Sequence, residues 1–254
     1  MKKLFPAALA ILMATGCTGG FKTALYTDDQ AMPLVEGRTD SLLFSISVEY
    51  PVSGAPQEVL DNITANILSA SFDLEEDPGT VEETASRYEE NIKDEYFTEN
   101  EDVLLALGKG NTHSGILSWE DRVNGYFSGA WRKYRSYMIE YYNFRGGAHG
   151  SVTMTPIVFD AKTGEVVLEE NFFADGYREP VGQLIRAHLP EALDGNQDDL
   201  NALFDPDQIG PNGNFEVTKD GITWYWQPYD IGPYYLGVIS VSLPWKDVKK
   251  YLRK

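Results

Sequence analysis

The alternation of apolar and polar residues predicts a first strand at 41–50, where the run SLLFSISVEY ends at Pro51. Two amphipathic helices are expected to follow. The first begins after Pro56, and the second begins at Thr80, which stands three residues before Glu83 in the spacing of a capping box. Both stretches carry an apolar stripe at helical spacing, which is typical of helices that pack on a core.

The second half of the chain is richer in aromatic residues. Over residues 118–144, Tyr, Phe and Trp are interleaved with polar residues, a pattern that favours long antiparallel strands. A strand over 151–160 is expected to turn back through 160–165, with Gly164 in the left-handed position of the turn. The remaining expected elements are helices at 181–189 and 200–204, a hairpin turning at 220–221, strands at 222–226 and 236–243, and a terminal helix after Pro244.

Helices interspersed with hairpin-linked strands predict the α+β class, with an antiparallel sheet and helices packed on it. No Pro/Gly/Ser-rich linker separates the two halves. We therefore expect one compact unit made of two sub-regions, a helix-rich α+β region at 39–130 and a second α+β region at 131–254.

The N-terminus has the pattern of a bacterial export signal. Lys2 and Lys3 precede a short apolar run and small residues, and the single cysteine of the chain, Cys17, follows. This arrangement resembles the lipobox of bacterial lipoproteins, although Ala14 stands where Leu is commonest. We expect residues 1–16 to be removed as a signal peptide and Cys17 to carry the lipid that holds the protein on a membrane. The alternative is an ordinary secreted protein with one buried thiol.

Residues 17–38 lack sustained periodicity and are expected to form a tether. The stretch after Cys17 lacks the acidic run that directs some lipoproteins to the cell surface. This favours an anchor in the outer membrane that faces the periplasm, with the cell surface as the alternative.

The composition is strongly acidic, with 39 acidic and 21 basic residues. Loss of residues 1–16 would remove two lysines, leaving 19 basic and 39 acidic side chains and a net charge of −20. Such a charge repels nucleic acid and anionic lipid surfaces, and it fits either solubility alone or a cationic partner. A single cysteine excludes an intramolecular disulfide framework.

Three stretches occur in the same order as in a known family: Tyr141–Gly150 (YYNFRGGAHG), Phe159–Gly164 (FDAKTG) and Gln227–Tyr234 (QPYDIGPY). The chain resembles the domain-of-unknown-function family typified by the extracellular, lysozyme-binding C-terminal domain of the RsiV anti-sigma factor. Residues 40–130 resemble the partner domain that usually precedes it. The resemblance implies a binding module, with lysozyme as one partner. The sigma-binding segment and spanning helix of RsiV are not found here, and no lysozyme-contacting residue is carried over.

One candidate binding region is the glycine-rich bend that contains Arg145 and His149. Its glycines could expose backbone N–H groups beside a ligand-facing imidazole. The alternative is structural, a tight crossing between strands in which His149 bonds a backbone carbonyl. No second ligand stands at a familiar metal-binding spacing from His149, so no metal site is predicted.

The other candidate region is aromatic, and its members are Tyr225, Tyr229, Tyr234 and Tyr235. Rigid aromatic side chains recur at interface hot spots, whereas core packing alone is the alternative. Strand alternation places Trp224 and Trp226 on one face, which we expect to be core, and Tyr225 on the other.

The sequence lacks the Gly-x-Ser-x-Gly and His-Glu-x-x-His motifs of common hydrolases, and no catalytic residue or cofactor is predicted. The interpretation is therefore a lipid-anchored, non-catalytic binding module of the cell envelope, for lysozyme or a cell-wall component. An envelope enzyme acting on cell-wall glycan and a purely structural envelope protein stay as alternatives.

Overall fold

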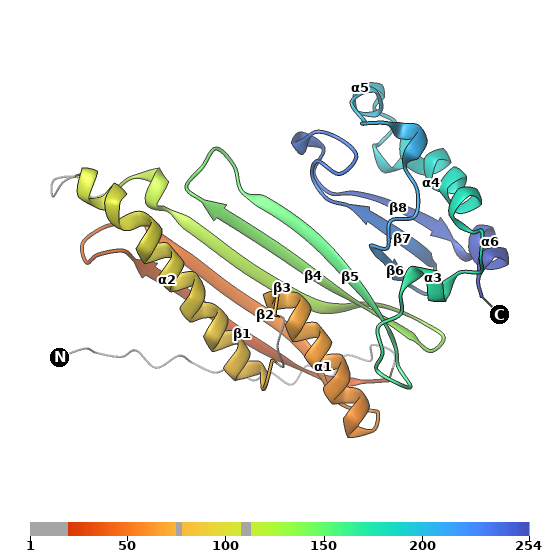
Figure 1. Ribbon diagram of the computed structural model, residues 1–254, viewed down its shortest axis with the longest axis horizontal. Coiled ribbons are helices and arrows are strands. Elements are labelled where there is room, and N and C mark those ends of the chain that lie inside the picture. The colour runs from red at the N-terminus through yellow and green to blue at the C-terminus, as the bar shows by residue number, and fades with distance from the viewer. Residues whose placement is uncertain (1–19, 75–77, 108–112, 254) are drawn as a thin grey trace.

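The structure is a computed structural model that describes residues 20–74, 78–107 and 113–253 (Figure 1). These residues form a five-stranded sheet, two helices packed on it, and a smaller unit built on a three-stranded sheet. The predicted α+β class is confirmed. The expected signal peptide and Cys17 lie outside the described residues. No helix within the described ranges is long and apolar enough to span a membrane.

The large sheet has the strand order β1-β2-β3-β4-β5. Its strands are β1 (Lys22–Pro33), β2 (Ser41–Ser53), β3 (Trp119–Trp131), β4 (Tyr134–Arg145) and β5 (Ser151–Asp160). Neighbouring strands pair antiparallel, except that β2 and β3 run parallel. The parallel pair departs from the predicted antiparallel sheet because two helices separate β2 from β3 in sequence and return the chain to the end where it started.

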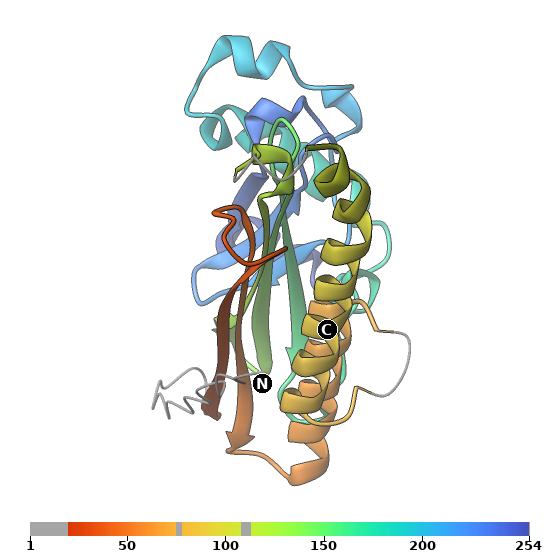
Figure 2. The same cartoon turned by 90° about the vertical axis from the view of Figure 1, so that its left-hand side faces the viewer.

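Helices α1 (Gln57–Phe72) and α2 (Val81–Leu107) lie on the same side of the large sheet (Figure 2). The predicted capping box opens α2: Glu83 donates its backbone N–H to Thr80 Oγ1 at 3.2 Å, and the Glu83 carboxylate accepts the Thr80 N–H at 3.1 Å. The apolar stripes of both helices cover the sheet as expected. Fully buried side chains between these layers include Leu42, Ile46, Ile63, Ile67 and Tyr137.

Strand β1 corrects the prediction of a tether over 17–38. Ala24 and Tyr26 are buried on the core side of this strand. Asp28 and Gln30 follow on the same side, where Gln30 donates to the Asp28 carboxylate at 3.0 Å, and Met32 then packs against the core. Because β1 is an edge strand with one partner, its apolar alternation is too short to stand out in the sequence.

The smaller unit follows β5. Its elements are α3 (Glu169–Phe172), α4 (Arg178–Ala192), α5 (Gln197–Asn201), β6 (Phe215–Val217), β7 (Gly221–Trp226), β8 (Ile239–Pro244) and α6 (Trp245–Val248). The helices expected at 181–189 and after Pro244 and the expected hairpin are present, whereas the short helix expected at 200–204 lies at Gln197–Asn201. The last strand begins at Ile239 instead of residue 236, because Tyr234–Leu236 form a 3-10 turn that ends at Gly237 with φ +65°.

The two hydrophobic cores meet at β5, where Phe159 belongs to the first and Val158 to the second. The expected division at residue 130 falls at the β3–β4 hairpin of the large sheet, so the change of core comes later in the chain. A buried polar contact joins the units: Ser136 Oγ donates to Val217 O at 2.9 Å and accepts the Val217 N–H at 2.8 Å. The second unit is thus fixed against the sheet at β4 and β5.

Candidate functional site

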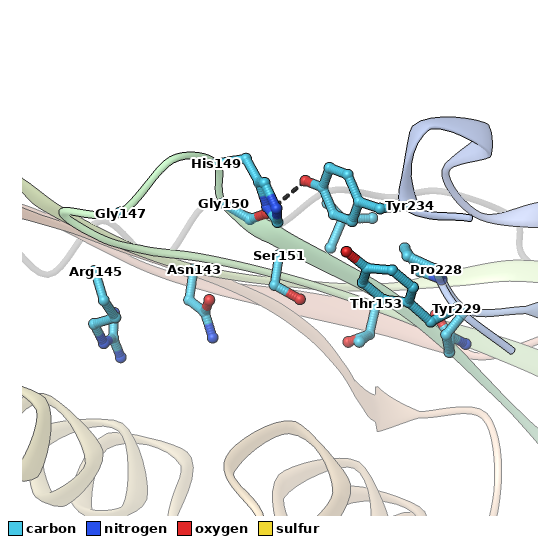
Figure 3. Close-up of a pocket in the computed structure, with 12 residues that line it drawn as sticks. Asn143, Arg145, Gly147, His149, Gly150, Ser151, Thr153, Pro228, Tyr229 and Tyr234 are labelled. Atoms are coloured by element: carbon cyan, nitrogen blue, oxygen red, sulfur yellow. Dashed lines mark hydrogen bonds between the residues drawn. The ribbon is translucent and has the colours of Figure 1, made fainter.

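A hollow of about 250 Å³ lies where the free edge of β5 meets the loop that follows β7 (Figure 3). We call it the β5-edge hollow. It is lined by Asn143, Arg145, Gly147, His149, Gly150, Ser151, Val152, Thr153, Gln227, Pro228, Tyr229 and Tyr234. The lining therefore joins the glycine-rich stretch 141–150 to the stretch 227–234, and it brings both predicted binding regions to one place.

Steric crowding explains why two positions in the bend between β4 and β5 are glycine. Gly146 has φ +72°, and a Cβ there would lie 1.9 Å from the carbonyl oxygen of Ile116. A Cβ at Gly150 would lie 2.5 Å from the Tyr142 ring. At Gly147, by contrast, an added Cβ would meet no atom within 4 Å. Close packing thus explains the outer glycines, while Gly147 borders open space.

His149 forms one wall of the β5-edge hollow together with Tyr234. Their rings stack with centroids 3.9 Å apart. The carbonyl of Gly150 accepts the Tyr234 hydroxyl at 2.5 Å and lies 3.0 Å from His149 Nδ1. The carbonyl contact is the one that the structural alternative for His149 predicted. The His149 side chain is nevertheless exposed, so the ring also offers an aromatic surface to the hollow.

Tyr229 is an exposed aromatic residue of the hollow, at 61%. Its ring centroid lies 5.8 Å from that of Tyr234, and its backbone has φ +74°. A turn holds this conformation, because Gln227 donates its N–H to the Asp230 carboxylate at 2.7 Å and its carbonyl accepts the Asp230 N–H at 3.0 Å. A non-glycine residue in the left-handed region costs on the order of 1 kcal/mol, and such residues cluster at binding sites.

Gln227 fastens this loop to the edge of β5. Its side-chain amide accepts the Met154 N–H at 2.9 Å and donates to the Met154 carbonyl at 2.7 Å, as a residue of an added strand would. Val152 lies two residues before Met154, so its backbone polar groups point outward in the same register. The Val152 N–H and C=O groups face the hollow, between the backbone groups that bond Tyr234 on one side and Gln227 on the other.

Tyr225 is a core residue, which corrects the prediction of an exposed anchor. It is 8% exposed, and its hydroxyl donates to the Glu216 carboxylate at 2.5 Å. Burial, followed by the hydrogen bond to Glu216, raises the pKa of Tyr225 above its usual range. Trp224 and Trp226 are buried on the opposite face of β7, as predicted.

Tyr235 is 65% exposed, but it lies beside Asp199 and does not line the hollow. The structure therefore unites Tyr229, Tyr234 and His149 and leaves Tyr235 on a separate surface.

Arg145 lines the hollow, but its guanidinium points toward the helices (Figure 3). It donates at 2.9 Å to Asp121, a fully buried carboxylate that also accepts the hydroxyls of Tyr88 at 2.8 Å and Tyr141 at 2.9 Å. Burial and the negative charge of Asp121 raise the pKa of Tyr88. A buried charge needs such partners. Asp121 was not predicted from the sequence, where its only signal is a carboxylate at an inward position of β3.

The electrostatic character of the β5-edge hollow differs from that of the whole chain. None of the described residues that line it is acidic, in a protein with 39 acidic residues. Its hydrogen-bonding side chains include the neutral Asn143, Ser151 and Thr153. Among the described parts of the chain, no three His, Cys, Asp or Glu residues are grouped as metal ligands would be. The hollow thus suits an uncharged ligand with a flat apolar face and hydroxyl groups.

Comparison with known proteins places the fold. Residues 170–246 match the family described as "Protein of unknown function (DUF3298)". A solved DUF3298 protein from Bacteroides fragilis is 22% identical, with a TM-score of 0.81, and the match covers 93% of this chain and 95% of that one. A second, from Pseudomonas aeruginosa, is 17% identical with a TM-score of 0.65 and coverages of 94% and 97%. No curated protein matches. The comparisons thus show a DUF3298 match over residues 170–246 and a fold shared with solved DUF3298 proteins, while the specific likeness to RsiV and the partner domain over 40–130 stay predictions.

Proposed function

We propose that the mature protein is a non-catalytic binding module of the cell envelope and that its β5-edge hollow holds a cell-wall glycan. The observation that carries the proposal is the exposed Tyr229 ring beside the stacked Tyr234 and His149 rings, above neutral hydrogen-bonding side chains. A sugar ring presents a flat C–H face that packs on aromatic rings, and its hydroxyls bond amides and hydroxyls.

The experiment is a calorimetric titration of residues 18–254 with soluble cell-wall glycan fragments. Replacing Tyr229 by Ala should weaken binding at least about tenfold, because truncation of an aromatic anchor typically costs about 2 kcal/mol or more. Tyr235→Ala is the matched control, since Tyr235 is similarly exposed but lies outside the hollow. Equal losses in both variants, or no binding by the wild type, would refute the glycan site.

Lysozyme is the second candidate partner, and a different surface favours it. The solvent side of α2 carries the exposed carboxylates of Glu83, Glu90, Asp94, Glu99, Glu101 and Asp102. Opposite charge speeds the encounter with a cationic protein. A specific complex should survive physiological salt and weaken in Glu99→Gln/Glu101→Gln, whereas binding that modest salt abolishes would be charge attraction alone. No binding at either salt would remove lysozyme.

The proposal includes a lipid anchor at Cys17, in the outer membrane and facing the periplasm. Its support is the charged start, the short apolar run and the solitary cysteine of the sequence. Labelled palmitate should enter the wild type and not Cys17→Ser, and equal labelling of both would contradict it. Protease added to intact cells should leave the protein whole, whereas digestion would place it on the cell surface.

A further inference from the structure

A second hollow of about 630 Å³ adjoins the β5-edge hollow, and we call it the helix-side hollow. Its floor is the helix-covered face of β4 and β5, and its wall is the end of α1 with the middle of α2. Asn143, Arg145 and Thr153 line both hollows. These three side chains point from the strands toward the helices (Figure 3). The two hollows therefore adjoin along these three residues, and we call the pair the groove; Tyr229 lines one hollow and the helices border the other.

The chemistry changes along this groove. The β5-edge hollow has no acidic residue among the described residues that line it, whereas the helix-side hollow is lined by the carboxylates of Asp73 and Glu95. Asp73 is the exposed C-cap of α1, with φ 50°. The Glu95 side chain is 41% exposed and lies 3.8 Å from Arg145 Nε. Arg145 carries one positive charge and faces the carboxylates of both Asp121 and Glu95, so this cluster keeps a net negative charge. The exposed Asp73 adds a further negative charge, which favours a cation.

A buried polar atom adds a second observation at the same place. Ser71 lines the helix-side hollow and is 7% exposed, and its hydroxyl has no hydrogen-bond partner within the described residues. Buried hydroxyls are nearly always bonded, so Ser71 lacks a partner that a water or ligand in the hollow would supply once its side chain rotates toward it. The helix-side hollow therefore combines negative charge with an unused hydrogen-bonding group.

We propose that the groove binds an extended, amine-bearing glycan. A neutral sugar lies in the β5-edge hollow, and a primary ammonium group on the same ligand lies in the helix-side hollow against Asp73 and Glu95. This inference rests on the proposed glycan-binding function and adds the class of glycan. The ammonium has two chemical sources, an unacetylated amino sugar or the free amine of a peptide attached to the glycan. The shared chemistry is a cation carried beyond the first sugar ring.

The test is a calorimetric titration of the mature chain with matched probes. One pair is tetrameric N-acetylglucosamine and the fully deacetylated tetramer. The other is a disaccharide peptide with a free amine and the same compound with that amine acetylated. In at least one pair, the ammonium form should bind about threefold to fivefold tighter than its neutral partner, as expected for an ion pair with exposed carboxylates. The pair that shows the gain identifies the source.

Variants in which one carboxylate is replaced by its amide show which side chains bind the ammonium group. Asp73→Asn and Glu95→Gln should each reduce the gain from the ammonium while neutral probes keep their affinity within about twofold. Glu101→Gln is the matched control, because Glu101 is an exposed carboxylate of α2 outside the groove, and it should keep the full gain. Asp73→Asn is the safer variant for folding, since Asn also tolerates the left-handed conformation.

The experiment distinguishes failure of the amine site from failure of the proposed function. If neutral glycans bind and Tyr229→Ala removes that binding, but neither ammonium probe gains affinity, the amine site is refuted and the proposed function stands. The amine site is also refuted if Glu101→Gln loses the gain as fully as Asp73→Asn, because the effect is then general charge attraction. If no glycan binds at all, the proposed function itself fails.

Discussion

Replacing the buried Asp121 by Asn should destabilise the fold strongly. The carboxylate is fully buried and accepts hydrogen bonds from Arg145, Tyr88 and Tyr141 at 2.9, 2.8 and 2.9 Å. Each such bond to a charged group contributes about 1.5–3 kcal/mol, and the cost of burying the charge offsets part of their sum. Asn has nearly the same shape, but it removes the negative charge opposite Arg145 and turns one acceptor into a donor. Loss of one partner of a buried ion pair costs about 3–5 kcal/mol, which is the expected fall in the free energy of unfolding.

The assay is urea unfolding followed by circular dichroism at neutral pH. Glu120→Gln is the control, because Glu120 is the neighbouring residue and its ion pair with Arg122, at 3.0 Å, is partly exposed. A pair of this kind contributes about 0–1 kcal/mol. Tyr141→Phe should fall between the two, since it removes one of the three bonds. If Asp121→Asn unfolds within about 0.5 kcal/mol of the wild type, the inference that this network fixes Arg145 is refuted.

The bend and the second unit give two further predictions. Gly146→Ala should lower the free energy of unfolding by more than about 1 kcal/mol, because Gly146 has a positive φ and a Cβ there would lie 1.9 Å from the Ile116 carbonyl oxygen. Gly147→Ala should leave stability nearly unchanged. Equal thermal midpoints for the two variants would contradict this. Burial raises the pKa of Glu169 above its usual 4.5. Between the usual pKa and the raised one, Glu169 is therefore protonated in the native state and ionised in the unfolded state. Stability should therefore fall as pH rises from the ordinary carboxyl pKa through the raised one, and Glu169→Gln should remove that fall in urea midpoints taken from about pH 4 to about pH 7. An unchanged slope would show that Glu169 is not the group responsible.

Local signals in the sequence were sufficient to predict most of the helices and strands. The capping box at Thr80 and Glu83 predicted the start of α2, and the aromatic alternation predicted β3 and β4. The edge strand β1 was missed, because an edge strand with one covered face needs few apolar residues. The parallel pairing of β2 with β3 depends on how the chain returns after two helices, which no local pattern records.

The candidate site could be predicted only in part, because it depends on contacts between distant parts of the chain. Alternation correctly placed Trp224 in the core, but it could not show that Tyr225, on the other face of β7, would be buried with its hydroxyl on Glu216, near Tyr126 and Glu140 of the large sheet. Nor could spacing show that His149 stacks on Tyr234, because that contact joins the two units. Residues from distant stretches formed one site because the loop after β7 is bonded to the edge of β5 by Gln227.

The most direct test of the central claim is nuclear magnetic resonance mapping of the 15N-labelled fragment 18–254 during titration with tetrameric N-acetylglucosamine. Binding in the β5-edge hollow should shift the backbone amides of Gly147, Val152 and Tyr229 progressively and in proportion, because all three line it. The amide of Asp199, on the separate surface beside Tyr235, should stay in place. Shifts confined to α2, or no shifts at saturating glycan, would contradict the claim that this hollow is a glycan-binding site.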